Sequence, residues 1–336
     1  MATIAINGLG RIGRAALKVI LETPELELVA VNDIVPIDNI VYLLKYDTVY
    51  GRYDKTVESD GENIVVAGKP VHYYSEKDPV HLPWDSLGVD IVLECTGVFT
   101  KREDLEKHVK AGAKYVILSA PAKSDDIVTV VHGVNTLDGE TRILACASCT
   151  TNCITPVVEI IGRRIGIKKA IMTTVHAYTA SQGIVDKPSK NYERGRAGAA
   201  NFVPTSTGAA KATAKALPEL DNLFDGIAVR GPVAVGSLAD IVIVAERKTS
   251  VEEINQIFAE EAASERYRDI IGVTEDPIVS SDIIKDPRAS IIDLGMTRVV
   301  DGDLIKILSW YDNEWGFTNQ MVRQAQQLAQ ATETVS

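Results

Sequence analysis

The sequence has no apolar run long enough to cross a bilayer. Runs such as Ile-Val-Ile-Val at 241–244 are short, whereas a membrane-spanning helix needs about 20 apolar residues. The opening residues, MATIAINGLG, enter a strand-like run without the basic and apolar regions of a secretion signal. We therefore expect a cytoplasmic protein with no membrane partner.

Cysteine and positive charge are also scarce. The 4 cysteines in 336 residues are too few for a disulfide scaffold, which favours a reducing compartment. The formal net charge of −11 argues against nucleic acid as a partner, because nucleic-acid binders are usually basic. Any anionic ligand must therefore be bound by locally placed arginine, lysine and helix N-termini.

The length predicts about two domains of roughly 150 residues each, and the secondary-structure pattern changes near residue 150. Before it, apolar runs alternate with amphipathic helices at 11–21 and 103–110, which is typical of a parallel α/β sheet. Strands are expected there at 3–6, 26–31, 91–93, 115–118, 127–131 and 143–145, with an antiparallel excursion at 57–71.

After residue 153 the expected strands are separated by fewer helices, which favours a mixed sheet. Residues 180–203 show little apolar periodicity, so this segment is either a functional or interfacial loop or a solvated surface excursion. Strands are expected at 171–175, 227–229, 238–245, 291–293 and 304–308, and helices at 251–262, capped by Ser250, and from 315 past 328.

A glycine pattern follows the first strand. Gly8, Gly10 and Gly13 form G-x-G-x-x-G between a strand and a helix, where glycines permit a tight turn and close approach of a pyrophosphate. Asp33 ends the next strand, 20 residues after Gly13, where a carboxylate binds ribose hydroxyls and repels a 2′-phosphate. Glycine turns of this kind can be purely structural, but together with Asp33 they predict NAD binding.

The segment ACASCTTNC at 145–153 contains three of the four cysteines: Cys146, Cys149 and Cys153. Zinc and iron–sulfur sites need four ligands as a rule, so we expect no metal. A helix that starts at 148–150 would place Cys149 in its first turn, where the helix dipole lowers the thiol pKa. Thr155 as N-cap followed by Pro156 is an equally good helix start; either leaves 148–152 suited to an oxyanion or phosphate.

A reactive cysteine requires a base. His176 directly follows the strand at 171–175, and although a lone histidine there is more often structural, it would form a nucleophile–base pair with Cys149. The other histidines are expected in solvated turns or surface helices: His72, His81, His108 and His132.

Basic residues and hydroxyls gather in the second half. Arg194 and Arg196 lie in the long loop, Thr-Ser-Thr-Gly at 205–208 precedes an expected helix at 209–216, and Arg230 ends a strand. Arginine, hydroxyls and a helix N-terminus are how an acidic protein binds phosphate. This pattern predicts more than one anion subsite, although each arginine could equally form a surface salt bridge.

Several motifs together resemble those of the phosphorylating glyceraldehyde-3-phosphate dehydrogenase family. They are NGLGRIGR at 7–14, LSAPAK at 118–123, ASCTTN at 147–152, HAYT at 176–179, PTSTGAAKA at 204–212 and WYDNEWGF at 310–317. The resemblance spans essentially the whole chain and implies a homotetramer. It also implies a Rossmann-type NAD-binding domain at 1–149, on which a C-terminal helix at about 314–336 packs, and an α+β catalytic domain with a mixed or antiparallel sheet at 150–313.

The resemblance further implies a reaction: reversible oxidation of glyceraldehyde 3-phosphate in glycolysis and gluconeogenesis. Cys149 would attack the aldehyde, His176 would take the proton, hydride would pass to NAD, and inorganic phosphate would cleave the thioester to 1,3-bisphosphoglycerate. Residues that match the family's sites for two phosphate groups are Ser148, Thr150, Thr179, Arg194, Arg196, Thr207, Gly208 and Arg230. Residues that match its cofactor contacts are Asn7, Gly8, Gly10, Arg11, Ile12, Gly13, Asp33, Lys77, Thr96, Ser119, Asn313 and Phe317.

Some positions depart from the family's usual residues and leave the fine cofactor and substrate preference open. These are Ser181 for Asp, Glu193 for Arg, Lys77 for Arg, Phe317 for Tyr, and RGPVAVGS at 230–237 for a sequence beginning R-V-P-T. Three rival functions are an erythrose-4-phosphate dehydrogenase that hydrolyses its thioester, a papain-type hydrolase using Cys149, His176 and Asn313, and a silent binding protein. The glycine pattern with Asp33 argues against the hydrolase.

Overall fold

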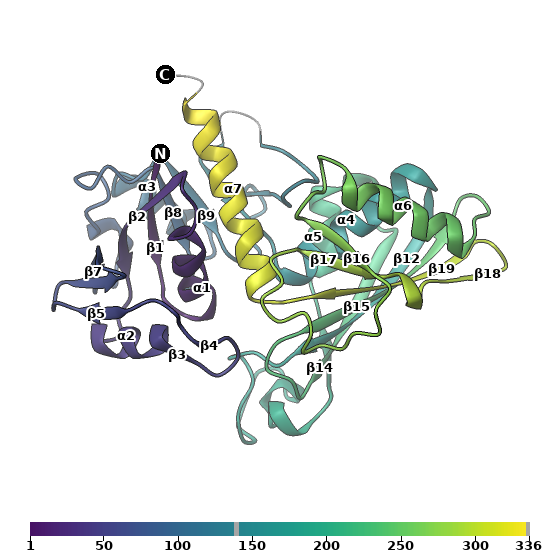
Figure 1. The fold of residues 1–336 in the computed structure, drawn as a ribbon, viewed down its shortest axis with the longest axis horizontal. Coiled ribbons are helices and arrows are strands. Elements are labelled where there is room, and N and C mark those ends of the chain that lie inside the picture. Colours follow the sequence, from purple (N-terminus) through teal and green to yellow (C-terminus); the bar gives the residue numbers. More distant parts are fainter. Residues whose placement is uncertain (138–140, 334–336) are drawn as a thin grey trace. The chain divides into compact units, whose positions relative to one another are not determined.

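The structure is a computed structural model and describes residues 1–137 and 141–333. It divides into two compact units, each built on its own sheet (Figure 1). The first unit comprises residues 1–130, the described part of 137–147 and the chain from 321 onwards. The second comprises residues 131–136 and 148–320.

The first unit contains a nine-stranded sheet in the order β10-β11-β9-β8-β1-β2-β7-β6-β5. Its strands from β10 to β7 run parallel, and β5, β6 and β7 form an antiparallel meander. The predicted parallel sheet and the antiparallel excursion are therefore confirmed. The strands are β1 (Ala2–Asn7), β2 (Leu26–Asn32), β5 (Val57–Ser59), β6 (Asn63–Val66), β7 (Lys69–Tyr74), β8 (Ile91–Glu94), β9 (Tyr115–Leu118), β10 (Val128–Thr129) and β11 (Ile143–Ala145).

Helices follow three of the parallel strands, as the crossover connections of an α/β sheet require. Helix α1 follows β1, α2 follows β2, and α3 follows β8. The sequence pattern did not predict α2, whose first residue follows Pro36 and which has no side-chain cap. The remaining elements of this unit are α1 (Arg11–Ile20), α2 (Ile37–Lys45), α3 (Arg102–Lys110), the hairpin of β3 (Tyr46–Asp47) and β4 (Gly51–Arg52), and the 3₁₀ turn η1 (Pro79–His81).

The second unit contains an eight-stranded sheet in the order β13-β14-β12-β15-β19-β17-β16, with β18 paired to β19. Strand β12 pairs parallel with β14 and antiparallel with β15, which confirms the predicted mixed sheet. The strands are β12 (Ile167–Ala177), β13 (Val203–Ser206), β14 (Phe224–Gly231), β15 (Ser237–Ala245), β16 (Ile271–Thr274), β17 (Ser290–Asp293), β18 (Arg298–Val300) and β19 (Leu304–Tyr311). The helices are α4 (Cys149–Arg164), α5 (Ala209–Ala216) and α6 (Val251–Ala263), and the 3₁₀ turns are η2 (Glu193–Gly195), η3 (Gly198–Ala200), η4 (Pro218–Leu220) and η5 (Leu294–Met296). Helix α7 (Trp315–Glu333) begins in the second unit and belongs to the first unit from residue 321.

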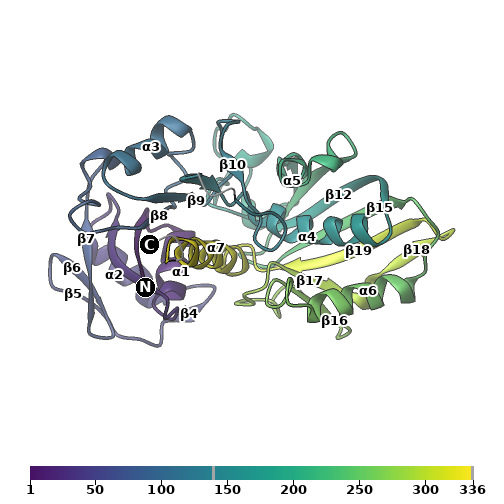
Figure 2. The ribbon, with the colours of Figure 1, turned by 90° about the horizontal axis from the view of Figure 1, so that it is seen from above.

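The core of the second unit lies between α4 and one face of this sheet. Helices α4, α5 and α6 cover the same face (Figures 1 and 2). Ile154, Val157 and Ile161 of α4 are fully buried and share one cluster with Ile241 and Ile305 of the sheet. Because each such side chain contributes about 1.5–3 kcal/mol when buried, α4 is held firmly and its N-terminal residues have a fixed position.

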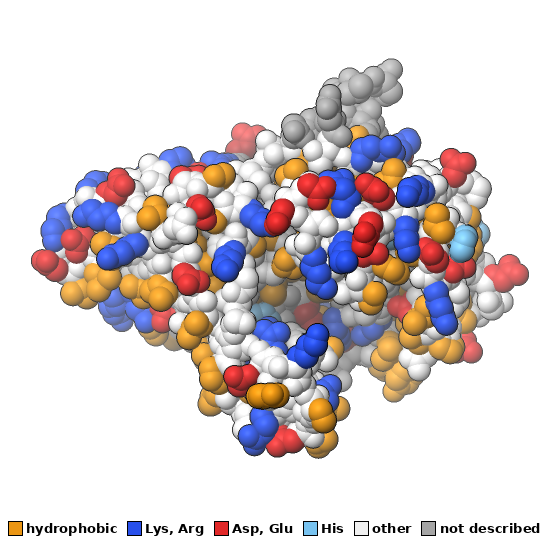
Figure 3. Space-filling view, turned by 180° about the vertical axis from the view of Figure 1, so that it is seen from behind, with side chains coloured by type: hydrophobic (Ala, Val, Ile, Leu, Met, Phe, Trp, Pro, Cys, Tyr) orange, Lys and Arg blue, Asp and Glu red, His pale blue; other side chains and the backbone are white. Residues whose placement is uncertain are grey.

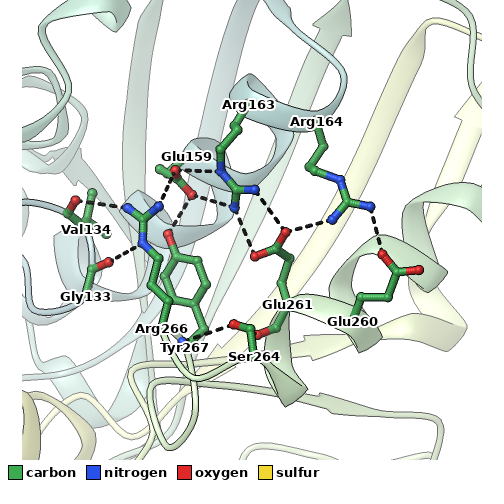
Figure 4. Close-up of polar contacts among 10 residues, drawn as sticks. All are labelled: Gly133, Val134, Glu159, Arg163, Arg164, Glu260, Glu261, Ser264, Arg266 and Tyr267. Atoms are coloured by element: carbon green, nitrogen blue, oxygen red, sulfur yellow. Dashed lines mark hydrogen bonds and ion pairs between the residues drawn. The ribbon is translucent and has the colours of Figure 1, made fainter.

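The last turns of α4 are held by a polar cluster that we call the α4 clamp, drawn in Figure 4: Glu159, Arg163, Arg164, Glu260, Glu261, Arg266 and Tyr267. Glu159 accepts hydrogen bonds from Arg163 (3.0 Å), Arg266 (3.0 Å) and the Tyr267 hydroxyl (2.6 Å). Glu261 on α6 accepts from Arg163 and Arg164. The clamp therefore joins α4 to α6 and to the segment that follows α6.

One predicted strand is shorter in the structure than expected, whereas the irregular loop expected at 180–203 is confirmed. The strand expected at 127–131 is shortened to the two residues of β10. The segment 180–203 contains no more regular structure than η2, η3 and an isolated bridge between Gly183 and Ala197 before β13 begins. Across residues 1–137 and 141–333, no helix combines the length and apolar character that a membrane span requires.

Candidate active site

Helix α4 begins at Cys149 because Ser148 caps it. The Ser148 hydroxyl accepts a hydrogen bond from the backbone N–H of Thr151 at 3.2 Å. Of the two helix starts that the sequence allowed, the first is therefore correct, and Pro156 lies inside α4, where it costs one backbone hydrogen bond. Ala147, just before the cap, has a φ of 56°, a left-handed conformation that non-glycine residues rarely adopt and that often marks functional sites.

Cys149 lies in contact with His176, with 3.3 Å between Sγ and Nε2. His176 is buried near the end of β12, where the parallel register pairs it with Arg230 of β14. Helix α4 and strand β12 thus bring the predicted nucleophile and the predicted base together within one unit.

The electrostatics of Cys149 differ from the sequence expectation. Burial raises the pKa of its thiol, although the charge of Arg230 and hydrogen bonds from Thr150 favour the thiolate. The expectation that the helix start lowers this pKa is therefore wrong, because the desolvation of the thiolate outweighs the helix N-terminus. Burial, assisted by the charge of Arg230, lowers the pKa of His176 to about 3, so its imidazole is neutral at pH 7.

Arg230 and the backbone compete for the other nitrogen of His176. Nδ1 lies 2.6 Å from Arg230 Nη1 and 2.7 Å from the carbonyl oxygen of Ala177. A guanidinium only donates, so contact with Arg230 requires an unprotonated Nδ1, whereas a bond to the Ala177 carbonyl requires a protonated one. The position of Arg230 therefore decides which nitrogen of His176 carries the proton.

Tyr311, which the sequence analysis did not single out, lies beneath this pair. Its buried hydroxyl lies 2.9 Å from the Thr150 hydroxyl and 2.7 Å from that of Thr174. Its ring packs edge-to-face against the His176 ring, with centroids 6.0 Å apart. The Thr150 side chain, expected to bind phosphate, is thus turned toward the core. The sequence offered one signal for Tyr311: it is an aromatic residue at the end of an expected strand, directly before Asp312 and Asn313.

Asn313 is oriented by two donors that sequence reasoning also missed. Its Oδ1 accepts hydrogen bonds from the Gly236 N–H (3.2 Å) and the Ser237 hydroxyl (2.9 Å). The Ser237 hydroxyl in turn accepts from the Ala177 N–H at 3.2 Å. Because Oδ1 is engaged, the Nδ2 hydrogens are the group that Asn313 offers to a ligand.

The residues expected to bind phosphate are only partly gathered at the Cys149–His176 pair. Arg194 bonds to the Thr205 hydroxyl (2.9 Å) and the Ser206 carbonyl (3.1 Å), and its charge helps to lower the pKa of His176. Arg196, by contrast, pairs with Asp186 within its own segment at 2.8 Å.

The remaining hydroxyls of the expected phosphate sites make local contacts. Thr207 accepts from the Ala209 N–H at 3.2 Å, and Gly208 directly precedes α5, with open space where a side chain would stand. The hydroxyls of Thr179 and Ser181 lie 2.9 Å apart.

The first unit contains a cavity of ≈ 390 Å³ at the carboxyl ends of β1, β2 and β8. This is the edge of a parallel sheet where dinucleotides bind. Six residues of its lining were expected to bind the cofactor: Asn7, Gly8, Gly10, Asp33, Lys77 and Thr96. The rest of the lining was not predicted: Asn32, Ile34, Glu76, Cys95, Val98 and Phe99.

The backbone around this cavity has the features of a dinucleotide site. Gly8 has a φ of 92°, and a Cβ there would lie 2.7 Å from the Thr96 nitrogen; a Cβ on Gly13 would lie 1.9 Å from the Gly8 oxygen. Helix α1 begins after Gly10 without a side-chain cap, and a helix N-terminus is where a pyrophosphate binds. Asp33 accepts from the Leu9 N–H (2.6 Å) and the Val35 N–H (3.0 Å), which leaves acceptor capacity for ribose hydroxyls. These residues fit NAD.

Other expected cofactor residues lie outside the cavity lining. Arg11 pairs with Asp47 at 2.5 Å, Ile12 follows it in α1, and Phe317 is buried in α7. The Ser119 side chain contacts the Cys95 thiol. These contacts are all within the protein, so the roles of these residues in binding NAD stay predictions.

The cysteines have separate environments. Cys153 is fully buried and its thiol lies 3.4 Å from the Ser309 hydroxyl. Burial raises the pKa of both Cys146 and Cys153 to about 12, which makes these thiols unreactive. In the part of the chain that the structure describes, no three His, Cys, Asp or Glu side chains are grouped as a metal ion would need.

Comparison with known proteins agrees with this geometry. Residues 2–102 match the domain described as "Glyceraldehyde 3-phosphate dehydrogenase, NAD binding domain", and residues 148–313 match the C-terminal domain of the same family. The chain is 46% identical over 323 residues to glyceraldehyde-3-phosphate dehydrogenase 2 of Streptomyces avermitilis, covering 95% of this chain and 96% of that protein. It is 45% identical over 330 residues to glyceraldehyde-3-phosphate dehydrogenase of Zymomonas mobilis, covering 97% and 98%. The chain therefore belongs to the glyceraldehyde 3-phosphate dehydrogenase family.

Proposed function

We propose that this chain oxidises glyceraldehyde 3-phosphate with NAD and inorganic phosphate, giving 1,3-bisphosphoglycerate in the glycolytic direction and the reverse in gluconeogenesis. The observation that carries the proposal is the Cys149 Sγ–His176 Nε2 contact of 3.3 Å at the start of α4. Membership of the family and a cavity at the carboxyl edge of the parallel sheet support NAD as the oxidant. We assign the cofactor to residues 1–149 with the C-terminal helix, and the chemistry to residues 150–313.

Cys149 attacks the aldehyde carbon and forms a hemithioacetal, and its proton passes to His176 Nε2. This transfer requires an unprotonated Nε2, which is the tautomer with Nδ1–H bonded to the Ala177 carbonyl. A phosphate on the substrate would draw Arg230 away from His176 Nδ1, where it lies at 2.6 Å, and so favour this tautomer. Substrate binding and activation of the base are thereby linked through one guanidinium.

NAD, when bound, supplies the acceptor for the hydride that leaves the hemithioacetal carbon. On the protein side, Asn313 Nδ2 is free to donate to a carboxamide oxygen because Oδ1 is held by Gly236 and Ser237. Asp33 would bind the adenosine ribose and disfavour a 2′-phosphate. The resulting Cys149 thioester is then cleaved by inorganic phosphate, for which we propose Arg194 and the N-terminus of α5 at Gly208.

The hydrolase alternative is disfavoured by a particular contact. In a papain-type site the asparagine orients the catalytic histidine, whereas Asn313 Oδ1 accepts from Gly236 and Ser237. The His176 Nδ1 contacts are to Ala177 and Arg230 instead.

The test is turnover of glyceraldehyde 3-phosphate with NAD, followed by the absorbance of the reduced cofactor, with and without inorganic phosphate. We expect sustained turnover only with phosphate. Equal turnover without phosphate would contradict acyl-phosphate formation and favour hydrolysis of the thioester, the erythrose-4-phosphate dehydrogenase type of reaction. C149S is expected to abolish turnover, and C153S, which changes a core thiol, to retain most of it.

We also propose that the chain forms a homotetramer in the cytoplasm, with no nucleic-acid or membrane partner. The face of the second sheet opposite to α4, α5 and α6 presents apolar residues: Ile171, Val175 and Ile227 are 59%, 40% and 52% exposed. The β12–β14 register places all three on one side of the sheet. The segment 180–203 adds further exposed apolar side chains: Ile184, Val185, Tyr192 and Phe202. Apolar side chains are also seen at the bottom of the face shown in Figure 3.

A further inference from the structure

A buried network of polar side chains crosses the first unit beside the glycine turn, and of its members only Asn7 is among the residues expected to contact the cofactor. Its members are Trp84, His108, Glu94, Asn7 and Asn32, which are between 0% and 3% exposed. The expectation that His108 is solvated is therefore wrong: on α3 its ring faces the sheet and stacks near the Trp84 ring. Such a network is costly to bury unless every member is satisfied.

The hydrogen bonds of this network are donated in sequence from both ends toward the Glu94 carboxylate. The Trp84 indole N–H donates to His108 Nδ1 at 3.1 Å, and because an indole only donates, the His108 proton must lie on Nε2. His108 Nε2 therefore donates to Glu94 Oε2 at 3.1 Å. From the other side, Asn32 Nδ2 donates to Asn7 Oδ1 at 2.7 Å, and Asn7 Nδ2 donates to Glu94 Oε2 at 2.6 Å.

The second carboxylate oxygen of Glu94 holds the next turn of the cofactor cavity. Oε1 accepts from the Thr96 backbone N–H at 2.8 Å and also from the Thr96 hydroxyl. Thr96 is the residue against which Gly8 packs, so closely that a Cβ on Gly8 would lie 2.7 Å from its nitrogen. Glu94 thus binds, through three hydrogen bonds, the two turns that line the cavity on either side, and a fourth ties it to His108.

We propose that Glu94, with His108 and Trp84 behind it, is a positioning residue for NAD: it holds the Asn7–Gly8 turn and the Thr96 turn in their binding geometry. The inference rests on the proposed dinucleotide site. A site whose turns are already ordered loses less free energy on binding than one that must order them. The effect therefore belongs to cofactor affinity and leaves the chemistry at Cys149 unchanged.

A glutamine at position 94 has no acceptable orientation. Its NH₂ group would face either the Thr96 N–H or the Nε2–H of His108 and the amide of Asn7, all of which donate. His108 cannot invert to relieve the conflict, because Nδ1 must accept from Trp84. E94Q therefore disturbs the turns with almost no change in volume.

A matched control lies at the opposite end of β1 and β8, the strands that end in Asn7 and Glu94. Asp90, just before β8, accepts from the Thr3 backbone N–H (2.8 Å) and hydroxyl (3.0 Å) at the start of β1. D90N thus weakens the β1–β8 connection away from the cavity. It reports what general loosening of this sheet does to cofactor binding.

The experiment measures the Kd for NAD by quenching of tryptophan fluorescence, together with the thermal midpoint and kcat at saturating NAD, in wild type, E94Q and D90N. We expect E94Q to raise the Kd and the KM for NAD about tenfold with kcat within twofold of wild type, and D90N to lower the midpoint with little change in Kd. An unchanged Kd in E94Q, or equal increases in E94Q and D90N, would overturn the proposal. Wild type that fails to bind NAD would instead refute the dinucleotide site itself.

A second pair keeps the test valid if E94Q does not fold. H108Q retains a donor to Glu94 and an acceptor for Trp84, whereas H108L removes both. We expect H108L to raise the Kd for NAD and H108Q to restore most of the affinity. Equal affinities in the two variants would show that His108 only fills space.

Discussion

One guanidinium acts on both members of the Cys149–His176 pair. Arg230 lies 2.6 Å from His176 Nδ1, and its charge opposes the effect of burial on the Cys149 thiol while it adds to the effect of burial on His176. Removing that charge should therefore raise the pKa of Cys149 further. It should also bring the pKa of His176 back toward its ordinary value.

We predict that R230M slows alkylation of Cys149 by iodoacetamide at pH 8 at least threefold, because less thiolate is present. The rate constant is measured by mass spectrometry of the Cys149 peptide across pH 6–10. R247M, which removes a surface arginine paired with Glu253, should alkylate as wild type does. A rate in R230M equal to or above that of wild type would show that Arg230 does not stabilise the thiolate.

The buried imidazole of His176 also makes stability depend on pH. Above pH ~6.5 it is neutral in both folded and unfolded chains; below that value only the unfolded chain binds the proton, until the folded pKa of about 3 is reached. Stability must therefore fall with decreasing pH in this window, by about 1.4 kcal/mol per pH unit from this residue.

We predict that H176Q reduces the slope of the unfolding free energy against pH between pH 6.5 and 4 by about 1.4 kcal/mol per pH unit. This change in slope is expected whatever the stability of the variant at pH 7. Urea unfolding at fixed protein concentration and several pH values measures it. H81Q, which replaces an exposed histidine, should follow the wild-type slope. Parallel curves for H176Q and wild type would mean that His176 is protonated in the folded protein.

Among single residues, the sequence predicts those that lie in recognisable motifs and misses those that hydrogen-bond to or pack against them. Cys149, His176 and Asp33 are signalled by a helix start, a strand end and a glycine pattern. Tyr311 and Ser237 carry no such signal, because their roles arise from contacts between strands distant in sequence. The rise in the pKa of Cys149 was missed for a related reason: burial at a helix start depends on what packs over it.

Among elements, long periodic segments were predicted well and short ones poorly. Strands such as β12 and β14 follow from apolar runs, whereas α2 lacks a capping residue and β10 is only two residues long. The α4 clamp could not be foreseen, because it joins residues about 100 positions apart on α4 and α6. It is also the element-scale feature whose contribution is most directly measurable.

We predict that E261Q lowers the free energy of unfolding by on the order of 2 kcal/mol at pH 7, because Arg163 and Arg164 lose a charged acceptor whose side chain is 9% exposed. Although burial raises it, hydrogen bonds from these arginines hold the pKa of Glu261 below its usual value. Its stabilising effect is thus present above the unfolded pKa and lost as pH falls through the folded one. Urea unfolding should show the variant and wild type converging as the pH falls below the ordinary pKa of a glutamate; a constant difference would contradict the ionic origin.

At the scale of the whole molecule, the exposed apolar face of the second sheet is a surface that another protein chain could bury. An exposed apolar face of this kind marks an interaction site, and here it lies on β12 and β14, whose ends carry His176 and Arg230. Assembly through this face would therefore stabilise the strands that position the site. Oligomer state and activity should then change together.

We predict that I227E, which places a charge on this face, shifts the chain from the proposed tetramer to smaller species, because burying an unpaired carboxylate in an interface costs several kcal/mol. Light scattering coupled to size-exclusion chromatography measures the mass. V80E, which adds the same charge at an exposed position of the first unit, should leave the mass unchanged. If I227E kept the wild-type mass, the uncovered face would not be the interface; if V80E dissociated as well, added negative charge alone would be the cause.

Since the face adjoins His176 and Arg230, dissociated I227E should also lose specific activity, and should regain it in part at high protein concentration.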